Sequence, residues 1–169
     1  AKPYSPFNLL GLIRKLLPPD LGPKMLMQGA ALLADTYPNP GLRPLSDIDL
    51  WALPGDSDRL LAALERLGFE GNPLTPGLLR RGDILVDVHA QLDWAERIRA
   101  RRFLFATDAE EIYRRCRPRS LEGVPVLSLD SYDQVTYLMV HAIKHNLERL
   151  IWLADIQRLV AAWQDPEWE

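Results

Sequence analysis

The chain has 169 residues, 47% of them hydrophobic and 25% charged, which is the composition of an ordinary globular protein with room for a sizeable core. Its formal net charge of −3 argues against a general nucleic-acid-binding surface. Because no apolar run approaches membrane-spanning length and Cys116 is the single cysteine, we expect a cytoplasmic protein without disulfides or a membrane partner.

The first part of the chain alternates between helical and extended patterns. An amphipathic helix over residues 6–19 ends at a pair of prolines. A short apolar strand, Lys24–Gln28, stops at Gly29, and helix formers follow over Ala30–Tyr37. After a proline-rich loop, Asp47–Leu53 alternates as a strand does.

The middle of the chain contains the clearest helix and the clearest strand. Ser57–Gly68 has a serine N-cap, an apolar stripe and a closing glycine, which together predict a helix. A loop holding Pro73 and Pro76 leads to Asp83–Leu92, an apolar and β-branched run that predicts a strand.

The last part is mostly helical. Thr107–Cys116 predicts a capped helix, because its acidic residues come early and its arginines late. Ser120–Leu129 predicts a hairpin or a short extended arm around Gly123. The tail, Ser131–Trp163, is predicted to be helical, and a break or bend near Asn146 would make two helices of it.

These elements predict an α/β (α+β) fold: a small mixed sheet flanked by helices and followed by a helical C-terminal part. We expect residues 1–105 to form the α/β domain and residues 106–169 to form a helical subdomain that packs on it. The sequence does not indicate an oligomeric state.

Three aspartates lie where strands would bury them. Asp47 and Asp49 are two residues apart on one predicted strand, so their side chains share a face. Asp87 lies in the middle of another predicted strand. If the two strands are neighbours, three carboxylates converge, and oxygen ligands of this kind suit Mg²⁺ or Mn²⁺.

Each aspartate taken alone has a simpler structural interpretation. Asp47 could cap the end of the loop, Asp49 could pair with Arg43, and Asp87 could pair with an arginine of the preceding segment. The metal site is the better interpretation only of the whole set, because two acids share one strand register and the third lies in a separate strand.

Gly29 stands where the first strand passes into a helix. Such a junction points free backbone N–H groups and the positive end of a helix dipole at one place, which suits phosphate. A plain tight turn explains the same residues, so the motif is informative mainly through its position before the acidic pair.

The ordered set of motifs resembles a known family. The stretches GAALLADTYPNPGLRPLSDIDLWAL, LVDVHAQL and HAIKHNLERLIWLADIQRLV are similar to those of an uncharacterised nucleotidyltransferase-like family found mainly in bacteria. That family lies within the superfold of DNA polymerase β and kanamycin nucleotidyltransferase. The resemblance covers residues from about 24 to 160.

The resemblance implies an activity and a set of site residues. Asp47 and Asp49 would hold the metals that bind a nucleoside triphosphate, and Asp87 would share the second metal and help to deprotonate an acceptor hydroxyl. The α-phosphoryl group would be attacked in line, with pyrophosphate leaving, as in two-metal catalysis. Phosphate contacts would come from Gly29 and Ala30 and from two candidate clamps, Arg43 and Lys144.

The histidines have open roles. His141 and His145 are four residues apart on a predicted helix and share one face. They could bind a transition metal with Asp155 or line the cleft with Lys144, although packing within the fold is the simpler interpretation. His89, two residues after Asp87, could orient that acid, contact substrate or be structural.

The sequence therefore predicts a Mg²⁺- or Mn²⁺-dependent enzyme that transfers NMP from an NTP to a hydroxyl of an unidentified small molecule or protein. An alternative is a nucleotide-binding module of the same fold with weak or no turnover. A metal-dependent phosphohydrolase that uses the same acids is a third option.

Overall fold

The computed structural model describes residues 24–53, 55–90, 108–121 and 123–163. The helix expected over residues 6–19 and the domain boundary expected near residue 105 both lie outside these ranges. Among the described helices, none is long and apolar enough to span a membrane.

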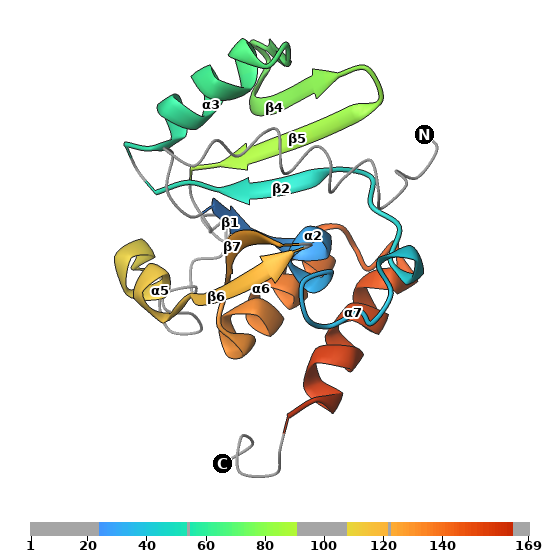
Figure 1. The fold of residues 1–169 in the computed structure, drawn as a ribbon. Coiled ribbons are helices and arrows are strands. Elements are labelled where there is room, and N and C mark those ends of the chain that lie inside the picture. Colours follow the sequence, from blue (N-terminus) through green and yellow to red (C-terminus); the bar gives the residue numbers. More distant parts are fainter. Residues whose placement is uncertain (1–23, 54, 91–107, 122, 164–169) are drawn as a thin grey trace.

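The strands form one seven-stranded mixed sheet in the order β3-β4-β5-β2-β1-β7-β6 (Figure 1). The pairs β1–β7 and β2–β5 are parallel, and the other neighbours are antiparallel. The strands are β1 (Lys24–Leu26), β2 (Ile48–Trp51), β3 (Glu70–Asn72), β4 (Thr75–Arg81), β5 (Ile84–His89), β6 (Arg117–Leu121) and β7 (Val124–Ser128). The predicted mixed α/β architecture is confirmed.

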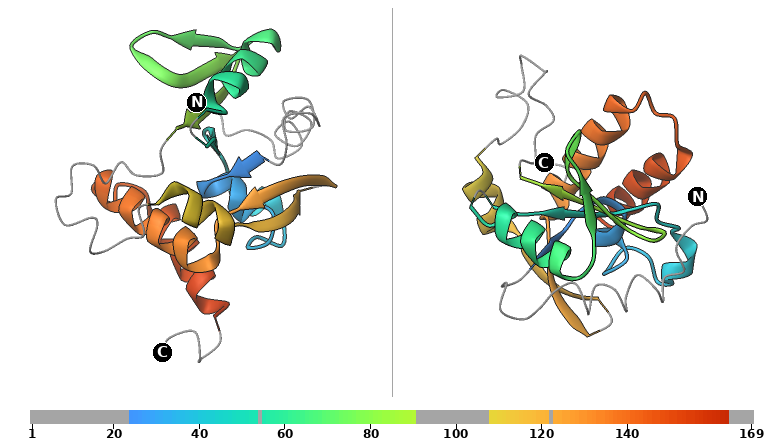
Figure 2. Two further views of the ribbon diagram at one scale, coloured as in Figure 1. Left: turned by 90° about the vertical axis from the view of Figure 1, so that its left-hand side faces the viewer. Right: turned by 90° about the horizontal axis from the view of Figure 1, so that it is seen from above.

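The helices pack around this sheet. In Figures 1 and 2, α3 and the β4–β5 hairpin lie at one end of the molecule, and α6 and α7 lie at the other. The α6 and α7 helices pack against each other. The helices are α2 (Gln28–Leu32), α3 (Ser57–Arg66), α5 (Ala109–Arg115), α6 (Ser131–Lys144) and α7 (Leu150–Ala161), with a short 3₁₀ turn, η2 (Pro40–Leu42).

The structure confirms some predicted local features and corrects others. The hairpin is present as β6–β7, and its strand β7 pairs with β1. The helical tail breaks between α6 and α7, where Asn146 and Leu147 have φ of 52° and 57°. The expected loop with Pro73 and Pro76 is only a tight turn: Pro73 lies in the turn of the hairpin β3–β4, whereas Pro76 lies within β4.

The hydrophobic core lies on both faces of the sheet. The larger cluster joins α2, β2, β5 and α6, and it includes Leu26, Leu32, Ile48, Leu50, Val86 and Leu138. The smaller cluster lies beside α5 and includes Met25, Met27, Trp51, Ile112, Leu129 and Tyr137. Every residue of β2 is buried, Asp49 included, because both faces of this part of the sheet are covered.

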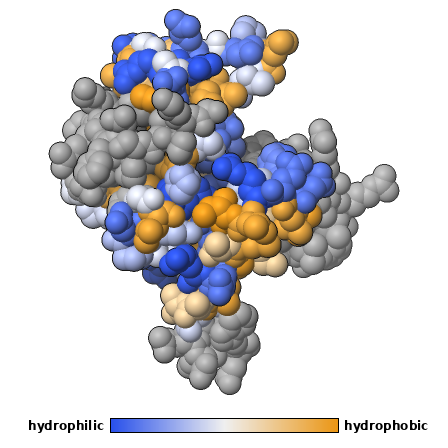
Figure 3. Space-filling view, turned by 90° about the vertical axis from the view of Figure 1, so that its right-hand side faces the viewer, coloured by the Kyte–Doolittle hydropathy of each residue, from blue (hydrophilic) through white to orange (hydrophobic). Residues whose placement is uncertain are grey.

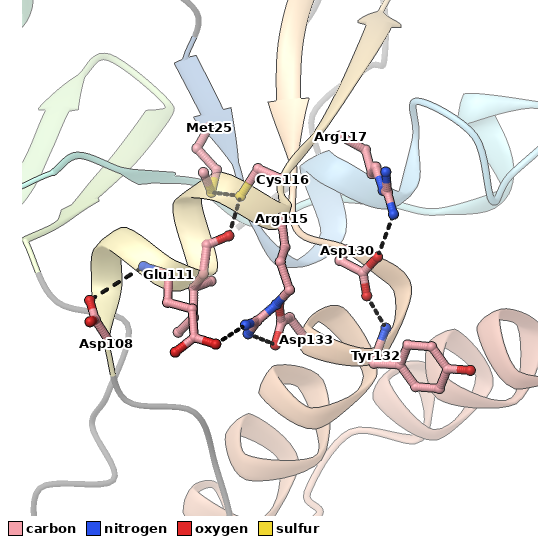
Figure 4. Close-up of polar contacts among 10 residues, drawn as sticks. Met25, Asp108, Glu111, Arg115, Cys116, Arg117, Asp130, Tyr132 and Asp133 are labelled. Carbon is pink, nitrogen blue, oxygen red and sulfur yellow. Dashed lines mark hydrogen bonds and ion pairs between the residues drawn. The ribbon is translucent and has the colours of Figure 1, made fainter. Parts of the chain in front are cut away.

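Polar contacts join α5 and the β6–β7 hairpin to the start of α6 (Figure 4). Arg115 donates to Asp133 at 3.0 and 2.9 Å and also reaches Glu111 at 3.0 Å. Asp130 caps α6 by accepting from the backbone N–H of Tyr132 at 3.1 Å. These contacts fix the N-terminal end of α6.

Some hydrophobic side chains of α6, α7 and their connection reach the surface. Figure 3 shows one face of the molecule, on which hydrophobic and hydrophilic residues form adjoining patches. The exposed large hydrophobic residues in these elements are Tyr132, Met139, Ile143, Leu147, Leu150 and Leu153.

A buried ion pair connects the segment before β2 to α7. Nη2 of Arg43 lies 2.7 Å from Oδ2 of Asp155, and the two side chains are 7% and 0% exposed. Tyr37 donates to Oδ1 of the same carboxylate at 2.7 Å. Burial and this hydrogen bond raise the pKa of Tyr37 to about 12. Asp155 thus joins two parts of the chain that are 112 residues apart.

Gly29 lies against this ion pair. A Cβ atom at position 29 would come within 2.6 Å of Nη1 of Arg43 and 2.6 Å of Cδ2 of Leu45. The Arg43 guanidinium cannot easily move away, because Asp155 and the carbonyl oxygen of Pro44 hold it. The glycine therefore has a packing role, in addition to any role toward phosphate.

We predict that Asp155→Asn lowers the free energy of unfolding by about 3–5 kcal/mol, because it leaves the buried Arg43 charge without its partner. Urea denaturation measures this change. In the matched control, Asp56→Asn, the loss should stay below about 1 kcal/mol, because the Asp56–Arg59 pair is exposed. Equal losses in the two variants would contradict a structural role for the buried pair.

Gly29→Ala should destabilise the protein by about 1–3 kcal/mol, because the added methyl group overpacks the site beside Arg43 and Leu45. Intrinsic helix propensity alone would favour alanine by about 1 kcal/mol, so the sign of the change separates the two effects. The control is Gly71→Ala, where a Cβ atom would meet no described atom within 4 Å. Chemical denaturation of both variants tests the difference.

Candidate active site

A cavity of about 430 Å³ opens between the sheet and the α6–α7 pair. It is bounded by the β1–α2 junction, by the segment that leads into β2, by β2 and β5, and by the end of α6 and the start of α7. The lining residues are Gln28, Gly29, Arg43, Leu45, Ser46, Asp47, Asp49, Asp87, His89, His141, Lys144, His145, Glu148, Arg149 and Trp152.

The pairing of two strands brings the predicted carboxylates together. The strands β2 and β5 are parallel neighbours, and Asp49 is the direct partner of Asp87 across them. Asp47 precedes β2 by one residue, and its Oδ1 accepts from the Ser46 hydroxyl at 2.9 Å. All three acids line the same cavity.

Asp49 is the buried member of the set and is held by two side chains. The side chain of Asp49 is 8% exposed, whereas that of Asp87 is 35% exposed. Oδ1 of Asp49 lies 3.0 Å from Nε2 of Gln28 and 2.9 Å from Nε2 of His89. The same His89 nitrogen is 3.7 Å from Oδ2 of Asp87.

The surroundings of Asp49 and His89 shift the pKa values of both groups. Burial raises the pKa of Asp49 to about 6, and the charges of Asp47 and Asp87 add to this effect, while the hydrogen bond with His89 opposes it. Burial would lower the pKa of His89, but the hydrogen bond to Asp49 and the charge of Asp87 outweigh it and raise the pKa. The site thus gathers negative charge that a cation would stabilise.

The donor chemistry of this cluster fits a divalent ion. Asp49, Asp87 and His89 each offer a ligand atom, and these atoms lie within 4.8 Å of one another. Asp47 lines the cavity beside them and adds a third carboxylate. Carboxylate oxygens suit Mg²⁺ and Mn²⁺, while the imidazole would widen the choice to softer metals.

The wall of the cavity that α6 and α7 provide carries basic groups. Lys144 ends α6, and Arg149 stands immediately before α7. Nη1 of Arg149 lies 3.4 Å from the Ser46 hydroxyl, so this wall reaches across to the segment before β2. Glu148 is the acid of this wall. The cavity therefore has an acidic side on the sheet and a mainly basic side on the helices.

His141 and His145 form part of an aromatic cluster with Trp152. Their ring centroids are 4.7 Å apart, and that of Trp152 lies 4.9 Å from His141. Burial, with the charges of His145 and Lys144, lowers the pKa of His141 to about 3, so this ring is neutral at physiological pH. The tilted stacking supports a packing role, and the metal-ligand group found among the described residues does not include these histidines.

Most of the residues predicted from the sequence face this one cavity. Ala30 differs: it is 1% exposed and does not line the cavity. The α2 helix that it belongs to is only five residues long. Arg43 lines the cavity, but several of its N–H groups bind Asp155 and Pro44, so its main observed contacts are structural.

The sequence did not indicate several other lining residues. They are Gln28, Leu45, Ser46, Glu148, Arg149 and Trp152. Ser46 and Gln28 adjoin predicted motif residues, so their positions were a usable signal. Glu148 and Arg149 follow the break between the two helices, and only the packing of α7 shows that they turn toward the sheet.

Comparisons with known proteins establish the fold and the family of the chain. Among solved structures, the chain is similar to ANT(2″)-Ia, whose crystal structure contains adenylyl-2″-tobramycin. The similarity has a TM-score of 0.64 at 17% sequence identity and covers 95% of this chain and 92% of that one. At this identity the likeness establishes the fold.

A comparison with curated proteins found no match. The profile of a family described as uncharacterised nucleotidyltransferase, in contrast, matches residues 8–169, which include both walls of the cavity. The chain therefore belongs to this nucleotidyltransferase family, as its acidic strand motifs had indicated.

Proposed function

We propose that the protein is a divalent-metal-dependent enzyme that transfers NMP from an NTP to a hydroxyl group of a small molecule or protein. One observation carries the proposal: parallel pairing of β2 and β5 sets Asp49 opposite Asp87 inside a cavity that Asp47 also lines. Family membership supports the nucleotidyl-transfer class of reaction.

The acids are proposed to act as two kinds of group. Asp47, Asp49 and Asp87 would hold the metal, which when bound neutralises the triphosphate and makes its α-phosphorus more electrophilic. Asp87 is the more exposed of the strand pair, which supports assigning it the role of accepting the proton of the acceptor hydroxyl. The new bond joins the acceptor oxygen to the α-phosphorus, and the bond to pyrophosphate breaks.

The basic wall is proposed to receive the phosphates. Lys144 and Arg149 line the same cavity as the acids, so a triphosphate bound there would contact positive charge on the helix side. Gly29 lines the cavity beside Arg43, so its backbone would lie near the phosphates. The remaining N–H groups of Arg43, which also lines the cavity, would donate hydrogen bonds to the phosphates.

The structural neighbour supports a small-molecule acceptor. The ligand in ANT(2″)-Ia carries an adenylyl group at the 2″ position of tobramycin, which is the kind of product that such a transfer forms. The fold that the two chains share can therefore accommodate a nucleotide and a compact acceptor together.

A binding module that holds a nucleotide without turnover is the second candidate. It is favoured by the Gly29–Ala30 pair, which offers no side-chain hydroxyl to phosphate, and by the engagement of Arg43 with Asp155. Asp87 favours the enzyme, because nucleotide binding alone does not require a proton acceptor beside the acceptor hydroxyl.

The first test is the thermal shift of the protein with each NTP, with and without Mg²⁺ or Mn²⁺. We expect a metal-dependent rise in melting temperature with NTP, because a ligand that binds the folded state stabilises it. The rise should vanish in Asp47→Asn/Asp49→Asn. The control, Asp56→Asn/Asp58→Asn, changes two carboxylates at and near the start of α3 and should respond as the wild type does. A wild type that responds to no nucleotide would refute the proposal.

The second test separates the enzyme from the binding module. Pyrophosphate release is measured with ATP, Mg²⁺ and candidate acceptors, tobramycin among them. Asp87→Asn should lower the rate by about 10²–10⁴-fold, the range typical of a lost general base, while keeping part of the nucleotide-dependent thermal shift. Nucleotide binding without pyrophosphate release by the wild type would favour the binding module.

A further inference from the structure

We propose that Gln28 and His89 are positioning residues that together hold one oxygen of Asp49, so that its other oxygen is presented to the metal. This inference rests on the proposed function, because it assigns the orientation of a carboxylate in that same site. It also gives His89 a role as a hydrogen-bond donor instead of a metal ligand.

The side-chain hydrogen bonds to Asp49 reach one of its two carboxylate oxygens. Both side-chain hydrogen bonds reach Oδ1, at 3.0 Å from Gln28 and 2.9 Å from His89. Within the described part of the chain, no hydrogen bond reaches Oδ2. An ionised carboxylate has accepting capacity on both oxygens, so this arrangement leaves Oδ2 as the oxygen with capacity for a cation.

His89 must donate to make its bond. An ionised carboxylate only accepts hydrogen bonds, so Nε2 of His89 carries the proton when it binds ionised Asp49. A nitrogen that carries a proton has no lone pair for a metal. The metal would then be left with carboxylate ligands from Asp47, Asp49 and Asp87, an oxygen set that favours Mg²⁺ and Mn²⁺ over zinc.

The backbone around Gln28 supports a fixed position for its side chain. Gln28 has a φ of 49°, in the left-handed region that non-glycine residues rarely adopt. The N–H of the preceding residue, Met27, donates to the carbonyl oxygen of Asp49 at 3.0 Å. Gln28 is 8% exposed, so its amide is enclosed with the carboxylate that it contacts. Strain of this kind is often found at functional sites.

The experiment measures Mn²⁺ binding by electron paramagnetic resonance of the free ion, without nucleotide or acceptor. Gln28→Met keeps the length of the side chain and removes its N–H donor. We expect its Mn²⁺ affinity to fall about 10–100-fold, the range typical when a group that orients a metal ligand is lost. Gln28→Gly adopts the observed φ without strain and should lose affinity in the same way, while avoiding a folding defect from the backbone.

The matched control is Gln134→Met. Gln134 is also buried, at 4% exposure, but it lies on α6 and does not line the cavity. The Gln134→Met variant should bind Mn²⁺ as the wild type does. If removing any buried amide weakened Mn²⁺ binding, this variant would also lose affinity.

His89 is tested by two variants. His89→Gln keeps an N–H donor near the position of Nε2 and should bind Mn²⁺ close to the wild-type affinity, whereas His89→Leu should weaken binding as Gln28→Met does. Equal losses in the two His89 variants would show that the imidazole itself is a ligand and would overturn the inference.

The outcomes also separate this inference from the proposed function. If the wild type binds Mn²⁺ and both Gln28 variants bind it equally well, the positioning role is wrong while the metal site stands. If the wild type binds no Mn²⁺, with or without NTP, the proposed metal-dependent activity and the positioning role both fail.

Discussion

The parallel pairing of β2 with β5 is the constraint on which the site depends. It fixes Asp49 beside Asp87, and two like charges directly opposite each other on a sheet are destabilising. Packing of apolar residues on both faces holds the two strands together, so the sheet cannot separate the carboxylates by slipping. Their repulsion is instead met locally, by hydrogen bonds from Gln28 and His89 to the more buried acid.

The ion pair between Arg43 and Asp155 completes the cavity from the other side. Arg43 belongs to the segment that leads to Asp47, and Asp155 belongs to α7, at whose start Arg149 lies. The ion pair thus joins this segment to α7. Gly29 allows the guanidinium to lie close to α2, so the first strand, the acidic strand and the last helix meet at one point. Contacts within the core therefore fix the spacing between the sheet and the helices that bound the cavity, without any ligand.

The parts of this site that could be predicted from the sequence are those that local periodicity encodes. Asp47 and Asp49 are two apart on a strand, and the break between α6 and α7 falls at polar residues around Asn146. The hairpin β3–β4 was missed because its prolines resemble those of a loop. The contact of Arg43 with Asp155, and of Gln28 with Asp49, arises from packing between distant segments, which a single sequence does not reveal.

In the proposed reaction, the two acids of the strand pair would perform different tasks and would therefore need different surroundings. A carboxylate that holds a metal benefits from a fixed orientation, and Asp49 is buried between two donors that supply it. A carboxylate that receives a proton must meet the acceptor hydroxyl, and Asp87 is the member of the pair that remains accessible. Equal burial of both would leave no group able to reach the acceptor. Under the proposed function, the asymmetry between Asp49 and Asp87 would suit the pair to catalysis as well as to binding.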